Sequence, residues 1–158
     1  MVATETAKRG VFARLLDEQT PHNSKVLEVG CGTGQLSNLL GMSWGRAVFG
    51  ADLCLNALPL GHRFSSAHKI DNMAFLQMNL FQPAFQSSSF NLVVCNDVLH
   101  HVKESIDLEA YAKELHRVLR EEGMLLIADR RPGLLNKLFL KANQIGRKLY
   151  LKMAPSRS

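Results

Sequence analysis

Three glycines alternate with other residues directly after a short apolar run, at Gly30, Gly32 and Gly34. Glycine permits positive φ angles and a tight turn, and the absence of side chains lets the backbone come close to a ligand. Backbone N–H groups at the start of a following helix then favour an electron-rich group. A dinucleotide fingerprint would need glycine at position 35, where the chain has Gln35. The loop therefore predicts a ligand site and disfavours a nicotinamide dinucleotide as its ligand.

Two acidic residues stand where they can act together with this loop. Glu28 lies inside an apolar run, where a carboxylate is costly unless it meets a cation or several hydrogen-bond donors. Asp52 ends a second apolar run, 18 residues after Gly34, and an acid there can accept both hydrogen bonds of a ribose diol. The alternatives are a structural Glu28 satisfied on its strand and an Asp52 that caps a helix.

Two adjacent histidines, His100 and His101, follow another apolar run. A histidine that titrates near neutral pH can take a proton from a hydroxyl acceptor. The alternative is that the pair shapes a pocket or caps the next helix, and Asp97 has the same two interpretations. The other histidines share no metal-ligand spacing, so no metal site is predicted.

Apolar runs and helical patterns alternate along the chain. Strands are expected at residues 25–29, 47–51, 73–78, 90–95 and 124–128, and helices at 5–19, 35–40, 55–69 and 106–120, the last ended by Gly123. This alternation predicts an α/β fold in which a parallel sheet carries helices on both faces. Ligands bind such sheets at the carboxyl ends of the strands, so the glycine-rich loop is expected there.

The segment VLEVGCGTG, residues 26–34, closely resembles the first motif of class I S-adenosylmethionine-dependent methyltransferases. Further similar segments are GADL at 50–53, QMNL at 77–80, SFNLVV at 89–94, VLHH at 98–101 and LREEGML at 119–125, so the resemblance covers about residues 24–129. It implies the small-molecule type of this family, similar to the methyltransferase type 11 domain. The implied fold is a Rossmann-like, doubly wound and mainly parallel sheet of about five strands in the order 3-2-1-4-5, without the usual terminal antiparallel strands.

The resemblance also implies S-adenosylmethionine as the cofactor and a set of residues that bind it. Glu28 would approach the methionine amino group through the loop. The methionine and ribose moieties would be lined by Gly30, Cys31, Gly32 and Gly34, and the ribose hydroxyls would bind Asp52.

Further residues would bind the two ends of the cofactor. Leu53 would pack on the adenine, and Asn79 and Leu80 would border it, with Asn79 near the exocyclic amine. Asn79 stands where the family usually has Asp. Asn96 would face the cofactor near the methyl group, and His100 and His101 are the candidate catalytic residues.

Together these features predict an enzyme that transfers a methyl group from S-adenosylmethionine to a small-molecule acceptor that the sequence does not identify. The alternative is a non-catalytic or truncated cofactor-binding domain that acts through a partner. An oxidoreductase that uses a nicotinamide cofactor is disfavoured by Gln35.

The 158 residues carry a formal net charge of +5, which would at first suggest a polyanionic partner. Residues 1–130, however, hold 12 basic and 14 acidic side chains, whereas residues 131–158 hold 7 basic and none that is acidic. The first segment shows no basic stripe with interleaved aromatic residues, so no nucleic-acid partner is expected.

The sequence thus divides into a methyltransferase domain at 1–131 and a basic tail at 132–158. Apolar residues of the tail share one helical face, and lysines share another: Leu135, Leu138, Ala142, Ile145, Leu149 and Met153 against Lys137, Lys141, Lys148 and Lys152. A basic amphipathic helix of this kind can lie on a membrane surface or dock on a protein partner. The alternative is that its apolar face covers an edge of the sheet.

The three cysteines, Cys31, Cys54 and Cys95, form no C-x-x-C pair and suit a reducing compartment. Cys31 and Cys95 are interpreted as small packing residues. The first ten residues lack the apolar segment of a signal peptide, and no apolar run approaches the roughly 18 residues of a membrane span. A cytoplasmic location is therefore expected.

Overall fold

The computed structural model describes residues 22–44, 46–79, 81–82, 84–101, 105–129 and 149–153; within these ranges the side chains of residues 43–44, 100, 105–107 and 149–153 are not described. The helix expected at 5–19 and residues 132–148 of the tail lie outside the described residues. No helix in the described ranges is long and apolar enough to cross a membrane.

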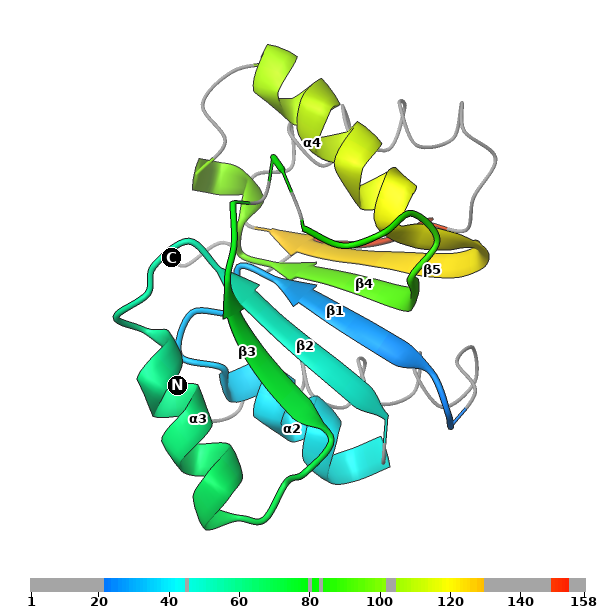
Figure 1. The fold of residues 1–158 in the computed structure, drawn as a ribbon. Coiled ribbons are helices and arrows are strands. Elements are labelled where there is room, and N and C mark those ends of the chain that lie inside the picture. Colours follow the sequence, from blue (N-terminus) through cyan, green and yellow to red (C-terminus); the bar gives the residue numbers. More distant parts are fainter. Residues whose placement is uncertain are drawn as a thin grey trace.

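Six strands form one sheet (Figure 1). They are β1 (Lys25–Val29), β2 (Ala47–Asp52), β3 (Met73–Gln77), β4 (Phe90–Asn96), β5 (Leu119–Asp129) and β6 (Leu149–Met153). Their spatial order is β3-β2-β1-β4-β5-β6, and every neighbouring pair runs parallel. The predicted order 3-2-1-4-5 is confirmed. Because the strands are parallel, the loops that follow them meet along one edge of the sheet, which we call the carboxyl edge.

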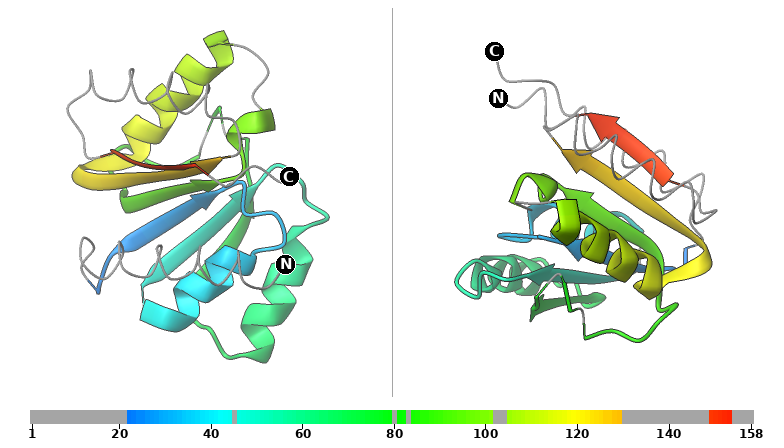
Figure 2. Two further views of the ribbon diagram at one scale, coloured as in Figure 1. Left: turned by 180° about the vertical axis from the view of Figure 1, so that it is seen from behind. Right: turned by 90° about the horizontal axis from the view of Figure 1, so that it is seen from above.

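The described helices lie on both faces of the sheet, as predicted (Figure 2). They are α2 (Gln35–Trp44), α3 (Leu58–Ala67) and α4 (Ser105–Val118), with a short 3-10 helix, η1, at Leu99–His101. Helix α4 packs on one face, and α2 and α3 lie together on the other.

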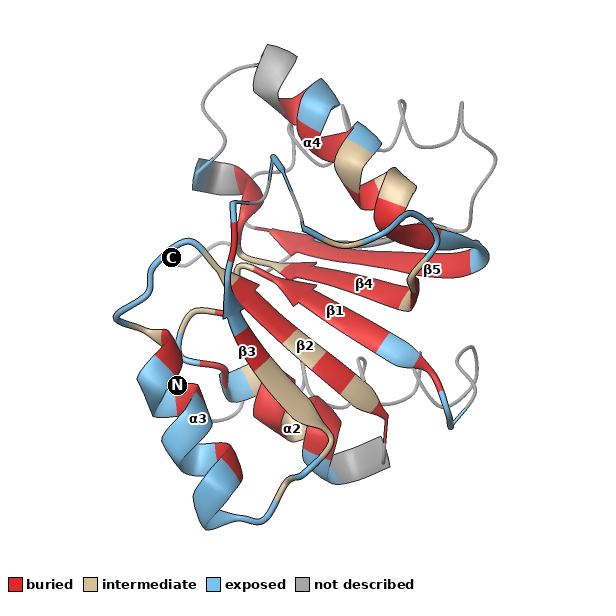
Figure 3. Ribbon diagram, viewed as in Figure 1, coloured by how far each residue is buried: buried red, intermediate tan, exposed pale blue. Residues whose placement is uncertain are grey.

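Neighbouring residues of each central strand pack into different cores, because successive side chains point to opposite faces of a sheet. Leu27 of β1 joins the core beneath α4, whereas Val26 joins the core beneath α2. Burial on both faces explains why the central strands are continuous apolar runs without alternation. Figure 3 shows these strands buried, while much of α3 is exposed.

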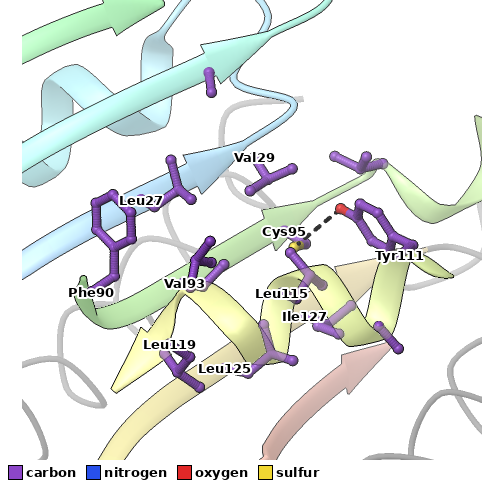
Figure 4. Packing of buried hydrophobic residues seen from close by; sticks show 14 of the residues in the cluster. Leu27, Val29, Phe90, Val93, Cys95, Tyr111, Leu115, Leu119, Leu125 and Ile127 are labelled. Atoms are coloured by element: carbon purple, nitrogen blue, oxygen red, sulfur yellow. Dashed lines mark hydrogen bonds between the residues drawn. The ribbon is translucent and has the colours of Figure 1, made fainter. Parts of the chain in front are cut away.

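A polar contact is buried in the core beneath α4. The Tyr111 hydroxyl donates to Cys95 Sγ at 3.4 Å, and both residues are fully buried (Figure 4). Burial raises the pKa of the Cys95 thiol to about 12 and that of Tyr111 well above its ordinary value. Cys31 is buried as well, so the prediction that these two cysteines are packing residues is confirmed.

The prediction of one helix through the tail is wrong at residues 149–153, which form β6. This strand pairs in parallel with β5, from Leu125 opposite Leu149 to Asp129 opposite Met153. Five residues with apolar side chains at alternate positions fit a strand as well as a helix, and the open edge of β5 supplies a partner for the backbone groups. The added strand is parallel, so it is not one of the terminal antiparallel strands that are usual in the family the sequence resembles.

The predicted end of the helix before β5 is also wrong. Helix α4 ends at Val118, and Gly123 lies within β5. The backbone N–H groups of Ser88 and Ser89 donate to the carbonyl oxygens of Arg117 and Val118, at 2.8 and 2.9 Å. The loop before β4 therefore satisfies the last carbonyls of the helix, a contact distant in sequence that a helical pattern does not reveal.

Leu115 offers a test of the core beneath α4, because it is buried between the helix and the sheet. The substitution Leu115→Ala is expected to lower the free energy of unfolding by about 2–5 kcal/mol, since it leaves a cavity in a tightly packed core. Urea denaturation measures the change. Leu60→Ala on the exposed side of α3 is the control and is expected to cost under about 1 kcal/mol; equal losses in the two variants would contradict this core.

Candidate functional site

The glycine-rich loop, residues 30–34, joins β1 to α2 at the carboxyl edge. The N–H groups of Gly30 and Cys31 both donate to the carbonyl oxygen of Ala51, at 2.8 and 3.0 Å. These two bonds tie the start of the loop to the end of β2. The three glycines of the loop all have positive φ angles, as a tight turn of this kind requires.

Gly32 is the open point of the loop. A Cβ atom built on this residue would meet no atom within 4 Å. At Gly34, by contrast, a Cβ would lie 2.4 Å from the Phe75 ring, so glycine is needed there for close packing. The loop is therefore packed on one side and bare at its tip, where a ligand can reach the backbone.

Asp52 connects this tip to the end of β2. Its Oδ2 accepts the Gly32 N–H at 2.7 Å, and its Oδ1 accepts the Cys54 N–H at 2.8 Å. A carboxylate oxygen can accept more than one hydrogen bond, so both oxygens keep capacity for hydroxyl donors. The structure thus brings Asp52 and Gly32, both predicted site residues, into direct contact.

Glu28 lies beneath the loop. It is 3% exposed, and the Ser37 hydroxyl of α2 donates to its Oε2. The backbone of Ser37 is hydrogen-bonded to the same carboxyl group. Burial raises the pKa of Glu28 to about 8, against the effect of the Ser37 bonds. Glu28 therefore anchors the first turn of α2 to β1, and its contact with a methionine amino group stays a prediction.

The predicted adenine-side residues lie at the ends of β2 and β3. Leu53 is 63% exposed, and its carbonyl oxygen accepts a hydrogen bond from Gln77 Nε2 at 3.2 Å. Asn79 is exposed and comes two residues after the end of β3. Leu80 lies outside the described residues.

The end of β4 lies beside the loop. The Val98 side chain packs against Gly30, where a Cβ would lie only 2.3 Å from Val98 Cγ2. At the end of β4, Asn96 has a buried Oδ1 without a hydrogen-bond partner in the described part of the chain. His101 is exposed at the end of η1, and the His100 side chain is not described.

Two further residues, Ser37 and Phe75, hold the loop in place and are not among the predicted site residues. Ser37 was identifiable in principle, because it is a serine in the first turn of the helix that follows an acidic strand residue. Phe75 has no such signal. Its ring fills the space left by Gly34, Gly50 and Gly61, which come from three different elements. Among the described residues, no three His, Cys, Asp or Glu side chains gather as a metal site requires.

Comparison with known proteins places these features in a family. The family model described as a methyltransferase domain matches residues 27–127. A malonyl-[acyl-carrier protein] O-methyltransferase of Paenibacillus sp. (strain JDR-2) is 30% identical over 132 residues, covering 80% of this chain and 44% of the relative. The phosphoethanolamine N-methyltransferase of Plasmodium falciparum (isolate 3D7) is 28% identical over 116 residues, covering 73% of this chain and 42% of the relative.

Among solved structures, the YcgJ protein of Bacillus subtilis superposes with a TM-score of 0.69 at 21% identity, covering 83% of this chain and 55% of the other. At this identity the likeness shows the fold alone. The chain spans about half the length of the curated relatives it matches.

The raised pKa of Glu28 predicts a specific dependence of stability on pH. The folded protein keeps this proton between pH 4.5, the ordinary value for the carboxyl group, and pH 8. The contribution of Glu28 to the free energy of unfolding therefore falls as the pH rises through this window. Glu28→Gln stays neutral and keeps a side-chain oxygen for Ser37, so its stability relative to the wild type is expected to increase from pH 5 to pH 9.

Urea unfolding at pH 5, 7 and 9 measures this difference. Glu121→Gln makes the same chemical change at an exposed position of β5 and is expected to follow the wild type at each pH. If the free energy of unfolding of Glu28→Gln also changes with pH as that of the wild type does, the pKa of Glu28 is not raised in the folded protein.

Proposed function

Since the chain belongs to the class I S-adenosylmethionine-dependent methyltransferase family, we propose that it transfers the methyl group of S-adenosylmethionine to a small-molecule acceptor. S-adenosylmethionine is the cofactor of this family. The chain spans about half the length of its curated relatives, so family membership does not by itself establish the activity of the whole protein, and we propose that activity here.

One observation carries the proposal: the bare backbone at Gly32 lies directly beside the Asp52 carboxylate. A nucleoside cofactor needs both features, a surface without side chains and an acceptor for two ribose hydroxyls. Both oxygens of Asp52 already hold a backbone N–H, so the carboxylate is fixed in place before any ligand arrives.

The unpartnered Oδ1 of Asn96 is a second feature that fits a ligand at the end of β4. A buried acceptor without a partner costs about 1–3 kcal/mol, and native proteins leave few such atoms. A donor group of a bound molecule would remove this cost at Asn96 Oδ1. The residues present therefore fit a cofactor that runs from the loop toward β4.

The bound sulfonium supplies a methyl carbon that is already activated for an in-line displacement. The chain then has to hold donor and acceptor in line, and positioning of this kind supplies much of the rate acceleration. In this proposal Gly32 and Asp52 hold the cofactor, while one of the two histidines, His100 or His101, takes the proton of an acceptor that must lose one. An acceptor that is already nucleophilic needs no such base.

The name of one relative supports the acceptor class. The Plasmodium falciparum protein is named for phosphoethanolamine, which is a small molecule.

Calorimetric titration with S-adenosylhomocysteine and, separately, with NADH tests the proposal. The chain is expected to bind S-adenosylhomocysteine, and Asp52→Asn is expected to weaken this binding by about 1–3 kcal/mol because it removes one charged acceptor. The substituted amide keeps one oxygen for the Gly32 N–H, so the loop stays tethered, while the bond from the Cys54 N–H is lost.

Asp71→Asn is the matched control, because Asp71 is an exposed acid in the turn before β3, at the opposite edge of the sheet. It is expected to bind as the wild type does. Binding of NADH without S-adenosylhomocysteine would refute the proposal. Binding of S-adenosylhomocysteine without methyl transfer to any acceptor would favour the alternative, a non-catalytic cofactor-binding domain.

A further inference from the structure

Asn79 lies at the carboxyl edge directly beside the end of β2. The preceding residue, Met78, donates its backbone N–H to the carbonyl oxygen of Asp52 at 2.9 Å. The glycine-rich loop after β1, Asp52 after β2 and Asn79 after β3 therefore follow one another along this edge. A nucleoside whose ribose binds Asp52, and whose other substituent lies on the loop, extends its base toward Asn79.

The side-chain amide of Asn79 has a fixed orientation. Its Oδ1 accepts the Phe81 N–H at 3.0 Å, and the Gln82 N–H donates to the Asn79 carbonyl oxygen at 3.1 Å. Only the amide oxygen can accept from a backbone N–H, so the chemistry of the turn settles which end of the amide faces Phe81. The Phe81 ring in turn packs on the buried Tyr111 ring, with centroids 5.9 Å apart.

Because Oδ1 accepts the Phe81 N–H, Nδ2 is the polar atom of the Asn79 side chain that can contact a ligand. Nδ2 makes no hydrogen bond to any described residue, and Asn79 is exposed at the site. A carboxylate in the same turn would use one oxygen for the Phe81 N–H and present the second oxygen as an acceptor. Asn79 presents a donor at that place.

The difference between an acceptor and a donor on the protein matters at position 6 of a purine. Adenine carries an amino group there, which donates, whereas hypoxanthine carries a carbonyl oxygen, which accepts. An acceptor on the protein favours adenine, while a donor pairs with the carbonyl oxygen of hypoxanthine.

We propose that Asn79, held by the Phe81 turn, presents its Nδ2 donor to position 6 of the purine and so lowers the preference of this site for a 6-amino over a 6-oxo purine. The inference rests on the proposed function, because it assumes that the nucleoside part of the cofactor binds at the carboxyl edge.

The test compares the affinities for S-adenosylhomocysteine and S-inosylhomocysteine, which differ at position 6. Calorimetry gives both dissociation constants for the wild type and for Asn79→Asp. The wild type is expected to prefer the adenosyl compound by less than about threefold. In Asn79→Asp that preference is expected to rise by about tenfold or more, since a donor is replaced by an acceptor while the turn keeps its oxygen.

Two further variants separate this effect from charge and from folding. Gln86→Glu adds the same charge at an exposed site before β4, away from the carboxyl edge, and is expected to leave the preference unchanged. Asn79→Ala removes the amide donor together with the oxygen that the turn uses, so it is expected to weaken the binding of S-inosylhomocysteine more than that of S-adenosylhomocysteine. It provides the readout if thermal unfolding shows that Asn79→Asp does not fold.

A rise of less than about fivefold in a folded Asn79→Asp overturns the inference and leaves the proposed function intact, provided that the wild type binds S-adenosylhomocysteine. If the wild type binds neither compound, the proposed function fails at its cofactor, and the inference fails with it.

Discussion

The glycine-rich loop has to expose its backbone to a ligand and still keep one shape. A turn in which three of the five residues are glycines with positive φ angles has few side chains of its own to hold it. The hydrogen bonds that tie it to the sheet come from β2: the Ala51 carbonyl oxygen accepts from Gly30 and Cys31, and the Asp52 carboxylate accepts from Gly32. The pairing of β1 with β2 therefore determines the geometry of the site, since it brings these acceptors beneath the loop.

Packing from β3 completes this support. The Phe75 ring lies so close to Gly34, Gly50 and Gly61 that a Cβ on any of them would come within 3 Å of a ring atom. One aromatic side chain thus determines the distance between the loop, β2 and α3. On the other side of the loop, Val98 leaves equally little space at Gly30. The bare tip at Gly32 stands out because the glycines on either side of it are tightly packed.

The two acidic residues near the loop differ in their burial and in their hydrogen-bond partners. Asp52 is half-buried at the carboxyl edge and keeps capacity for further donors, which suits ligand binding. Glu28 is buried, and its raised pKa means that it holds its proton near neutral pH. A neutral Glu28 joins β1 to α2 through Ser37 without the cost of a buried charge.

The sequence alone determined the positions of strands β1 to β5, apart from the start of β5, and those of the glycine-rich loop and of Asp52, because these depend on local periodicity and on residue types at set spacings. The order of the central strands followed from the resemblance of the motifs. Tertiary structure decided where α4 ends, because the N–H groups of Ser88 and Ser89 donate to the last carbonyl oxygens of the helix. It also decided that residues 149–153 form a strand, because they pair with the edge of β5. It also decided that Phe75 and Ser37 support the loop. These outcomes depend on which groups, distant in sequence, become neighbours in the fold, and a local sequence pattern does not identify such partners.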